Sequence, residues 1–110
     1  MIDETISKLE ARLQTDRNLN EQTRRELLEL LASLRGEVTD LSKTHAEEAH
    51  RIAGAAQASA VEATREERDP ELLRHSIDNL ASSVDGFERS HPKLVEIVNR
   101  IATTLANLGI

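Results

Sequence analysis

Residues 73–108 read LRHSIDNLASSVDGFERSHPKLVEIVNRIATTLANL, and apolar side chains recur in this segment at alternating steps of four and three residues. Ten of the eleven positions in this register are apolar, although hydrophobic residues make up only 38% of the chain. Such a spacing puts these side chains on one face of a helix, as in the seam of a coiled coil. The eleven positions are Leu73, Ile77, Leu80, Val84, Phe87, His91, Leu94, Val98, Ile101, Leu105 and Leu108.

The two prolines mark where a helix of this half begins or is interrupted. Asp69 precedes Pro70 and provides a capping carboxylate, and proline suits the first helical position because its missing N–H is not needed there. We therefore expect a helix over about residues 70–89. A proline inside a helix removes a hydrogen bond and clashes with the preceding turn. At Pro92 this helix therefore either continues with a kink or restarts over residues 92–108.

The N-terminal half contains a second apolar seam with the same spacing. Asn20 is a suitable N-cap, and small residues that favour helices and close helix packing extend as far as Ala63. We expect one long helix over about residues 20–66. The alternatives are a break near residues 36–45 or at Gly54, because glycine weakens a helix. The seam consists of Leu27, Leu31, Leu34, Val38 and Leu41.

Weaker helix signals lie at the two ends of the chain. Ile6, Leu9 and Leu13 are spaced by three and four residues, which predicts a short helix over about residues 3–14. At the other end, Gly109 can take the left-handed conformation that terminates many helices.

The two long segments are similar in length and are separated by the charged sequence TREERDPE at residues 64–71. At about 1.5 Å per residue, each spans roughly 60 to 70 Å. They predict one all-α domain over residues 1–110, built as a long antiparallel helical hairpin like a coiled coil. Because two helices leave much of the apolar stripe in water, we expect self-association into a dimer or tetramer, such as a four-helix bundle. The residues expected to form this assembly are Leu27, Leu31, Leu34, Val38, Leu41, Ile77, Leu80, Val84, Phe87, Leu94, Val98, Ile101 and Leu105.

Composition argues against several classes of function. The chain has no cysteine, so thiol nucleophiles and thiolate metal sites are excluded. Its formal net charge of -6 disfavours nucleic acid as a partner. No segment approaches the roughly 20 apolar residues of a membrane-spanning helix. The acidic start MIDETISKLE does not resemble a targeting signal, so we expect a cytoplasmic protein without a membrane partner.

The spacing Glu-x-x-His occurs twice, and it carries the most specific enzymatic or metal-binding hypothesis. The pairs are Glu47 with His50 and Glu88 with His91. Residues three apart share a helical face, and di-iron bundle proteins use paired motifs of this kind. The seam register, however, puts Glu47 and His50 on the outer face of the helix. Ordinary solvated side chains are therefore the preferred interpretation, with no catalytic residue and no cofactor expected.

His45 and Glu48 are of interest because the register of the N-terminal seam, continued past Leu41, buries them. Burying an unpaired charge costs several kcal/mol, which is more than the roughly 2 to 3 kcal/mol that a neighbouring leucine contributes. The seam therefore either opens to water at this point or holds the two residues as a pair that sets the register. A functional site is the third interpretation.

His91 and Phe87 lie beside the predicted bend at Pro92. Phe87 is the only aromatic residue, and we expect it to fill the core at the bend. His91 either bonds a free backbone group at the kink or acts as a binding or titrating residue beside Phe87.

The C-terminal sequence VDGFERSHPKLVEIVNRIATTLANLGI resembles the end of a small bacterial family that is known only as a domain of unknown function. The resemblance is carried by Phe87-Glu88, His91-Pro92, Leu94, Asn99-Arg100 and residues 105–110. The leucine-rich segment from Glu26 to Leu34 is also similar to the N-terminal half of that family. The resemblance implies a bacterial, intracellular, helical protein and implies no activity.

Together these patterns predict a non-enzymatic helical module for self-assembly or protein interaction. The alternative is a helical-bundle protein that binds metal through carboxylates and histidines.

Overall fold

The computed structural model describes residues 2–108, and that part of the chain forms helices and no strands. The predicted all-α class is therefore confirmed. None of the described helices has the length and apolar character that a membrane span requires. The helices are α1 (Ile2–Thr15), α2 (Glu21–Ser42), α3 (Ala46–Ala63), α4 (Pro70–Ser82) and α5 (Pro92–Leu108).

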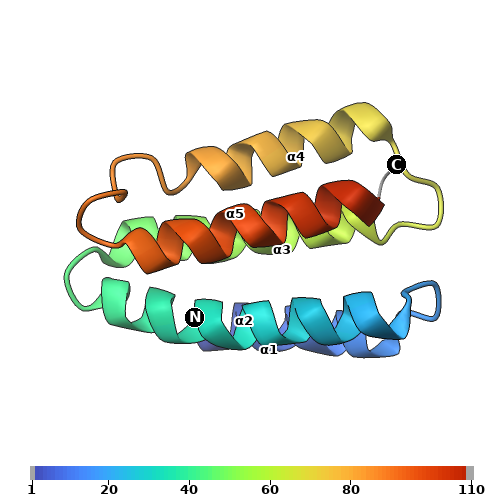
Figure 1. Ribbon diagram of the computed structural model, residues 1–110, viewed down its shortest axis with the longest axis horizontal. Coiled ribbons are helices and arrows are strands. Elements are labelled where there is room, and N and C mark those ends of the chain that lie inside the picture. The colour runs from blue at the N-terminus through green and yellow to red at the C-terminus, as the bar shows by residue number, and fades with distance from the viewer. Residues whose placement is uncertain (1, 109–110) are drawn as a thin grey trace.

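The helices form a bundle in which each helix runs back along the one before it (Figure 1). Helix α3 packs against all four of the others, while α2 also packs against α5. Helix α1 lies along α2 and α3, and α4 lies along α3 and α5. The bundle measures 38 × 25 × 22 Å, far shorter than a hairpin of two unbroken rods. Two of its turns, those between α2 and α3 and between α4 and α5, lie at the same end (Figure 1).

The predicted helix over residues 20–66 is wrong, because the chain turns at residues 43–45 between α2 and α3. The break falls in the alternative range of 36–45, and Gly54 lies inside α3. The carbonyl of Leu41 accepts hydrogen bonds from the N–H groups of Thr44 at 3.1 Å and His45 at 2.7 Å. This turn lets α3 fold back onto α2, so that the two halves of one predicted rod bury each other's apolar faces.

The C-terminal segment is also divided, since α4 ends at Ser82 instead of residue 89 and α5 restarts at Pro92. The restart was one of the two predicted alternatives at this proline. Gly86 has a φ of 94°, a conformation that is costly for any residue with a Cβ atom. The N–H of Phe87 donates to the carbonyl of Val84 at 3.1 Å, which closes the turn.

Both predicted helix starts are confirmed. The side chain of Asn20 accepts hydrogen bonds from the N–H groups at positions 22 and 23, at 2.7 and 3.4 Å. The carboxylate of Asp69 accepts from positions 71 and 72 at 3.0 and 3.3 Å, directly before Pro70. Gly109, which was expected to end the last helix, lies outside the described residues.

The residues expected to contact a second copy form the core of a single chain. Of the thirteen, Ile77 and Phe87 are half-buried, and the other eleven are buried. The five-helix bundle thus supplies from one chain the apolar partners that we expected from another. The buried members are Leu27, Leu31, Leu34, Val38, Leu41, Leu80, Val84, Leu94, Val98, Ile101 and Leu105.

Arg24 of α2 caps the C-terminal end of α1 and the turn that follows it. Its side chain is 13% exposed, and its guanidinium donates hydrogen bonds to the carbonyls of Leu13 and Gln14. It also donates to the carbonyls of Asp16 at 2.7 Å and Leu19 at 3.2 Å. The last carbonyls of a helix have no partner within the helix, so one cation satisfies groups that would otherwise need water.

Replacing Arg24 by methionine should lower the free energy of unfolding by about 2 kcal/mol, because hydrogen bonds from a charged donor to these carbonyls are lost. Urea denaturation followed by circular dichroism measures this change. The exposed neighbour Arg25 gives the matched control, and Arg25→Met should change stability by less than about 0.5 kcal/mol. Equal effects of the two substitutions would contradict the capping role.

The two glycines Gly86 and Gly36 should respond to alanine in opposite directions. Gly86→Ala should lower the free energy of unfolding by about 1 to 2 kcal/mol, because of its positive φ. Gly36 lies inside α2, and a Cβ atom there would meet no atom within 4 Å. Gly36→Ala should therefore raise stability by up to about 1 kcal/mol. Thermal unfolding of both variants tests the pair, and a stabilising Gly86→Ala would rule out the strained turn.

Candidate functional site

The two Glu-x-x-His pairs are not arranged as a metal site in the described part of the chain. Glu47 and His50 are exposed on α3, as the seam register predicted. Glu88 lies in the loop between α4 and α5, where its carboxylate accepts the N–H of Gly86 at 2.9 and 3.2 Å. Among residues 2–108 no group of three or more histidine, aspartate or glutamate side chains is arranged to hold a metal ion. The geometry therefore gives no support to the metal-binding alternative.

The structure brings together three rings that the sequence could only place separately. His45 lies in the turn before α3, while Phe87 and His91 lie in the loop before α5. The ring of Phe87 is 5.6 Å from each imidazole, centroid to centroid, and the two imidazoles are 6.4 Å apart. All three contacts are edge-to-face, the geometry that aromatic rings prefer.

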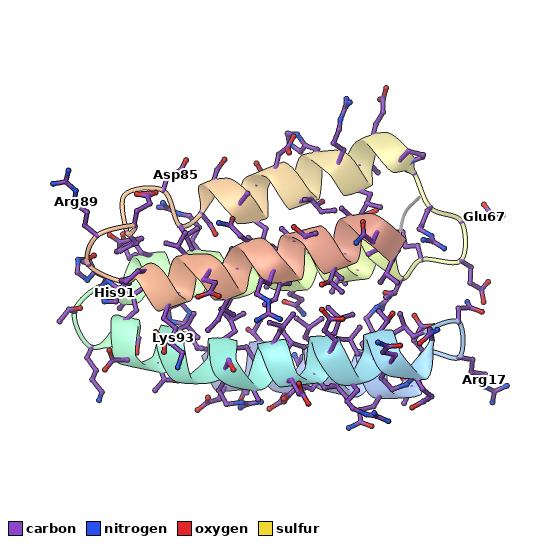
Figure 2. The ribbon with its side chains drawn as sticks, viewed as in Figure 1. Arg17, Glu67, Asp85, Arg89, His91 and Lys93 are labelled. Atoms are coloured by element: carbon purple, nitrogen blue, oxygen red, sulfur yellow. The ribbon has the colours of Figure 1, made fainter. Side chains whose placement is uncertain are left out.

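This cluster joins two loops at one end of the bundle. Figure 2 shows His91 at that end, opposite the end that carries Arg17 and Glu67. The Nδ1 atom of His45 is 2.8 Å from the hydroxyl of Thr44, and that of His91 is 2.9 Å from a serine hydroxyl. Phe87 is half-buried in the loop before α5, and its ring contacts the imidazole of His45 in the other loop.

His45 and Glu48 do not occupy a buried seam, which corrects the prediction made from the register. His45 is exposed and Glu48 is half-buried, because the turn at residues 43–45 ends the first seam and starts a new one. The new seam begins at Ala49 and Ile52, which are buried. Water therefore reaches the chain at this point, as the first of the three interpretations held.

A groove of about 480 Å³ runs between α3 and α4. Beneath it, Ser59 is fully buried and ties the two helices together. Its hydroxyl lies 2.9 Å from the carbonyls of Ala55 in its own helix and Ser76 in α4. The side chains that line the groove are short, apart from one arginine. The lining residues are Arg51, Ala55, Ala58, Ser76, Asn79, Ser82 and Ser83.

Leu72 extends this surface along α4. It shares a helical face with Ser76, Asn79 and Ser83, to which it is related by steps of four, three and four residues. Its exposed fraction is 51%, and it is the one large apolar residue that is exposed among the described residues. We call the groove and Leu72 together the α3–α4 face.

The alanine-rich sequence predicted the close packing on the buried side of α3 but gave no prediction for its exposed side. The small residues of α3 were predicted to let helices approach closely, and those that point inward are buried against the neighbouring helices. Gly54 and Ala58 lie on the outer side of α3 and are exposed. A Cβ atom at Gly54 would meet nothing within 4 Å, so the packing of this chain does not require glycine there.

Comparison with known proteins bears on the larger part of the chain. No curated protein and no solved structure matches it. A family model described as "Domain of unknown function (DUF4404)" matches residues 29–110, which include the ring cluster and the α3–α4 face. The chain therefore belongs to the DUF4404 family.

Proposed function

We propose that this chain is a non-enzymatic protein-interaction module whose docking surface is the α3–α4 face. The groove between the two helices carries the proposal. Its alanine and serine side chains are short, and the distance of approach between packed helices depends on the side chains at the contact. Exposed Leu72 adds an apolar side chain beside the groove. A helix of a partner protein is the element that such a groove best fits.

The buried seams support this choice of surface. Eleven of the thirteen residues first expected to contact another copy are buried in the core, so they are accessible only if the bundle opens. An interaction that leaves the bundle intact has to use exposed residues. Of the exposed surfaces, the α3–α4 face combines a groove with an apolar side chain.

A photo-crosslinking amino acid at Asn79 should capture a protein partner in the native cell, because Asn79 is exposed and lines the groove. The same amino acid at Ala32, which is exposed on α2, is the control. Immunoblotting after irradiation should show an adduct at position 79 and none at position 32. Equal labelling at both positions, or none at position 79, would overturn the proposed function.

A further inference from the structure

The outer side of α3 carries a continuous stripe of charged and small residues. The first five members follow one another at steps of four, three, four and four, which keeps them on one side of the helix. The last member lies two residues beyond the end of α3 at Ala63. The first four are exposed, and the exposed fractions of the last two side chains are 15% and 52%. The stripe consists of Glu47, Arg51, Gly54, Ala58, Glu62 and Arg65.

This stripe is complementary to itself when two copies of α3 run antiparallel. With the two-fold axis near position 56, Gly54 lies opposite Ala58 of the second copy. Arg51 and Glu62 lie five and six residues from that position, and Glu47 and Arg65 each lie nine residues from it. Arg51 therefore meets Glu62 of the second copy, and Glu47 meets Arg65. Each contact occurs twice, as a two-fold interface requires.

Two other arrangements, a parallel pair of α3 helices and an antiparallel pair of α2 helices, lack this match. In a parallel pair of α3 helices every charge would face its own copy, and like charges across an interface are unfavourable. Helix α2 has a comparable exposed stripe around Gly36. Its antiparallel pairing would set Arg25 against Lys43 and Glu29 against Asp40, which again are like charges. Both α2 and α3 thus carry small exposed residues around a glycine. Of these two helices, α3 is the one whose charges match in an antiparallel pair.

The carboxylate of Glu62 forms an ion pair with Arg65 of the same chain, but its Oε1 atom accepts no hydrogen bond from the described residues. This atom is buried and lies 3.0 Å from Nε of Arg65. An arginine from outside the chain would add positive charge beside this carboxylate, as the antiparallel arrangement does with Arg51.

We infer that the partner of the α3–α4 face is a second copy of the chain, bound through an antiparallel α3–α3 contact. Gly54 and Ala58 form its centre, where the two backbones approach closely. The pairs Arg51–Glu62 and Glu47–Arg65 fix the direction and register of the two helices. This inference rests on the proposed function, since it names the partner of the same surface.

A charge exchange tests the register directly. In a homodimer of Arg51→Glu, two carboxylates face each other at this contact, and in a homodimer of Glu62→Arg, two guanidinium groups do. Each variant alone should have a dissociation constant at least about tenfold above that of the unaltered chain. An equimolar mixture should form a heterodimer, because both of its contacts join a carboxylate of the first variant to a guanidinium group of the second.

The mixed dimer restores a balance of charge that neither homodimer has. Each homodimer carries two pairs of like charges at these positions. In the heterodimer one contact pairs the two substituted residues, which are opposite in charge, and the other pairs the two unaltered ones, which are also opposite. Sedimentation equilibrium measures the dissociation constants, and a mass-tagged copy identifies the mixed dimer.

The matched control makes the same exchange on α2, with Arg25→Glu and Glu29→Arg, which are both exposed. These variants should dimerise like the unaltered chain. Circular dichroism checks that each variant is folded. If Glu62→Arg unfolds the bundle, the pair Glu47→Arg and Arg65→Glu repeats the test at two exposed positions.

The outcomes separate the inference from the proposed function. A dimer whose dissociation constant is unchanged by the α3 variants, or no gain on mixing them, would overturn the antiparallel contact. A chain that stays monomeric at every concentration would overturn it as well. In either case, a crosslink from Asn79 to a different protein would leave the proposed docking surface standing. A mixed dimer formed by the α3 variants and not by the α2 variants would establish the inferred contact.

Discussion

The bundle depends on the small side chains of α3, which let this one helix pack against all four others. A helix with four neighbours needs short side chains at its contacts, since the interaxial distance is set by the residues there. Ile52 is the one large side chain among its buried residues. The rest are Ala49, Ala53, Ala56, Ser59, Ala60 and Ala63.

Because α3 is central, the apolar seams of α2 and α5 meet within a single chain. The turns at the bundle ends make this possible. Arg24 caps the turn after α1, and Gly86 adopts the positive φ of the turn before α5. The same folding brings His45 beside Phe87 and His91 and leaves the outer side of α3 exposed. Core and docking surface are thus two sides of one alanine-rich helix.

The candidate site could be predicted from the sequence only in part. His45, Phe87 and His91 were each singled out, but their contact joins two turns that are more than forty residues apart in the chain. Periodicity reports which side chains share a face and not which elements meet. For the same reason, the prediction that His45 and Glu48 are buried was wrong. It continued the register past Leu41, whereas the turn at residues 43–45 starts a new register.

The helical class, the apolar seams and the starts at Asn20 and Asp69 were determined by the sequence alone, because they depend on contacts within a few residues. The breaks at residues 43–45 and 83–91, and the burial of both seams in one chain, were decided by the tertiary structure. The physical reason is that a continuous amphipathic helix and a folded-back pair of helices have the same periodicity. Only the gain from packing the two halves together distinguishes them, and that gain depends on the whole bundle.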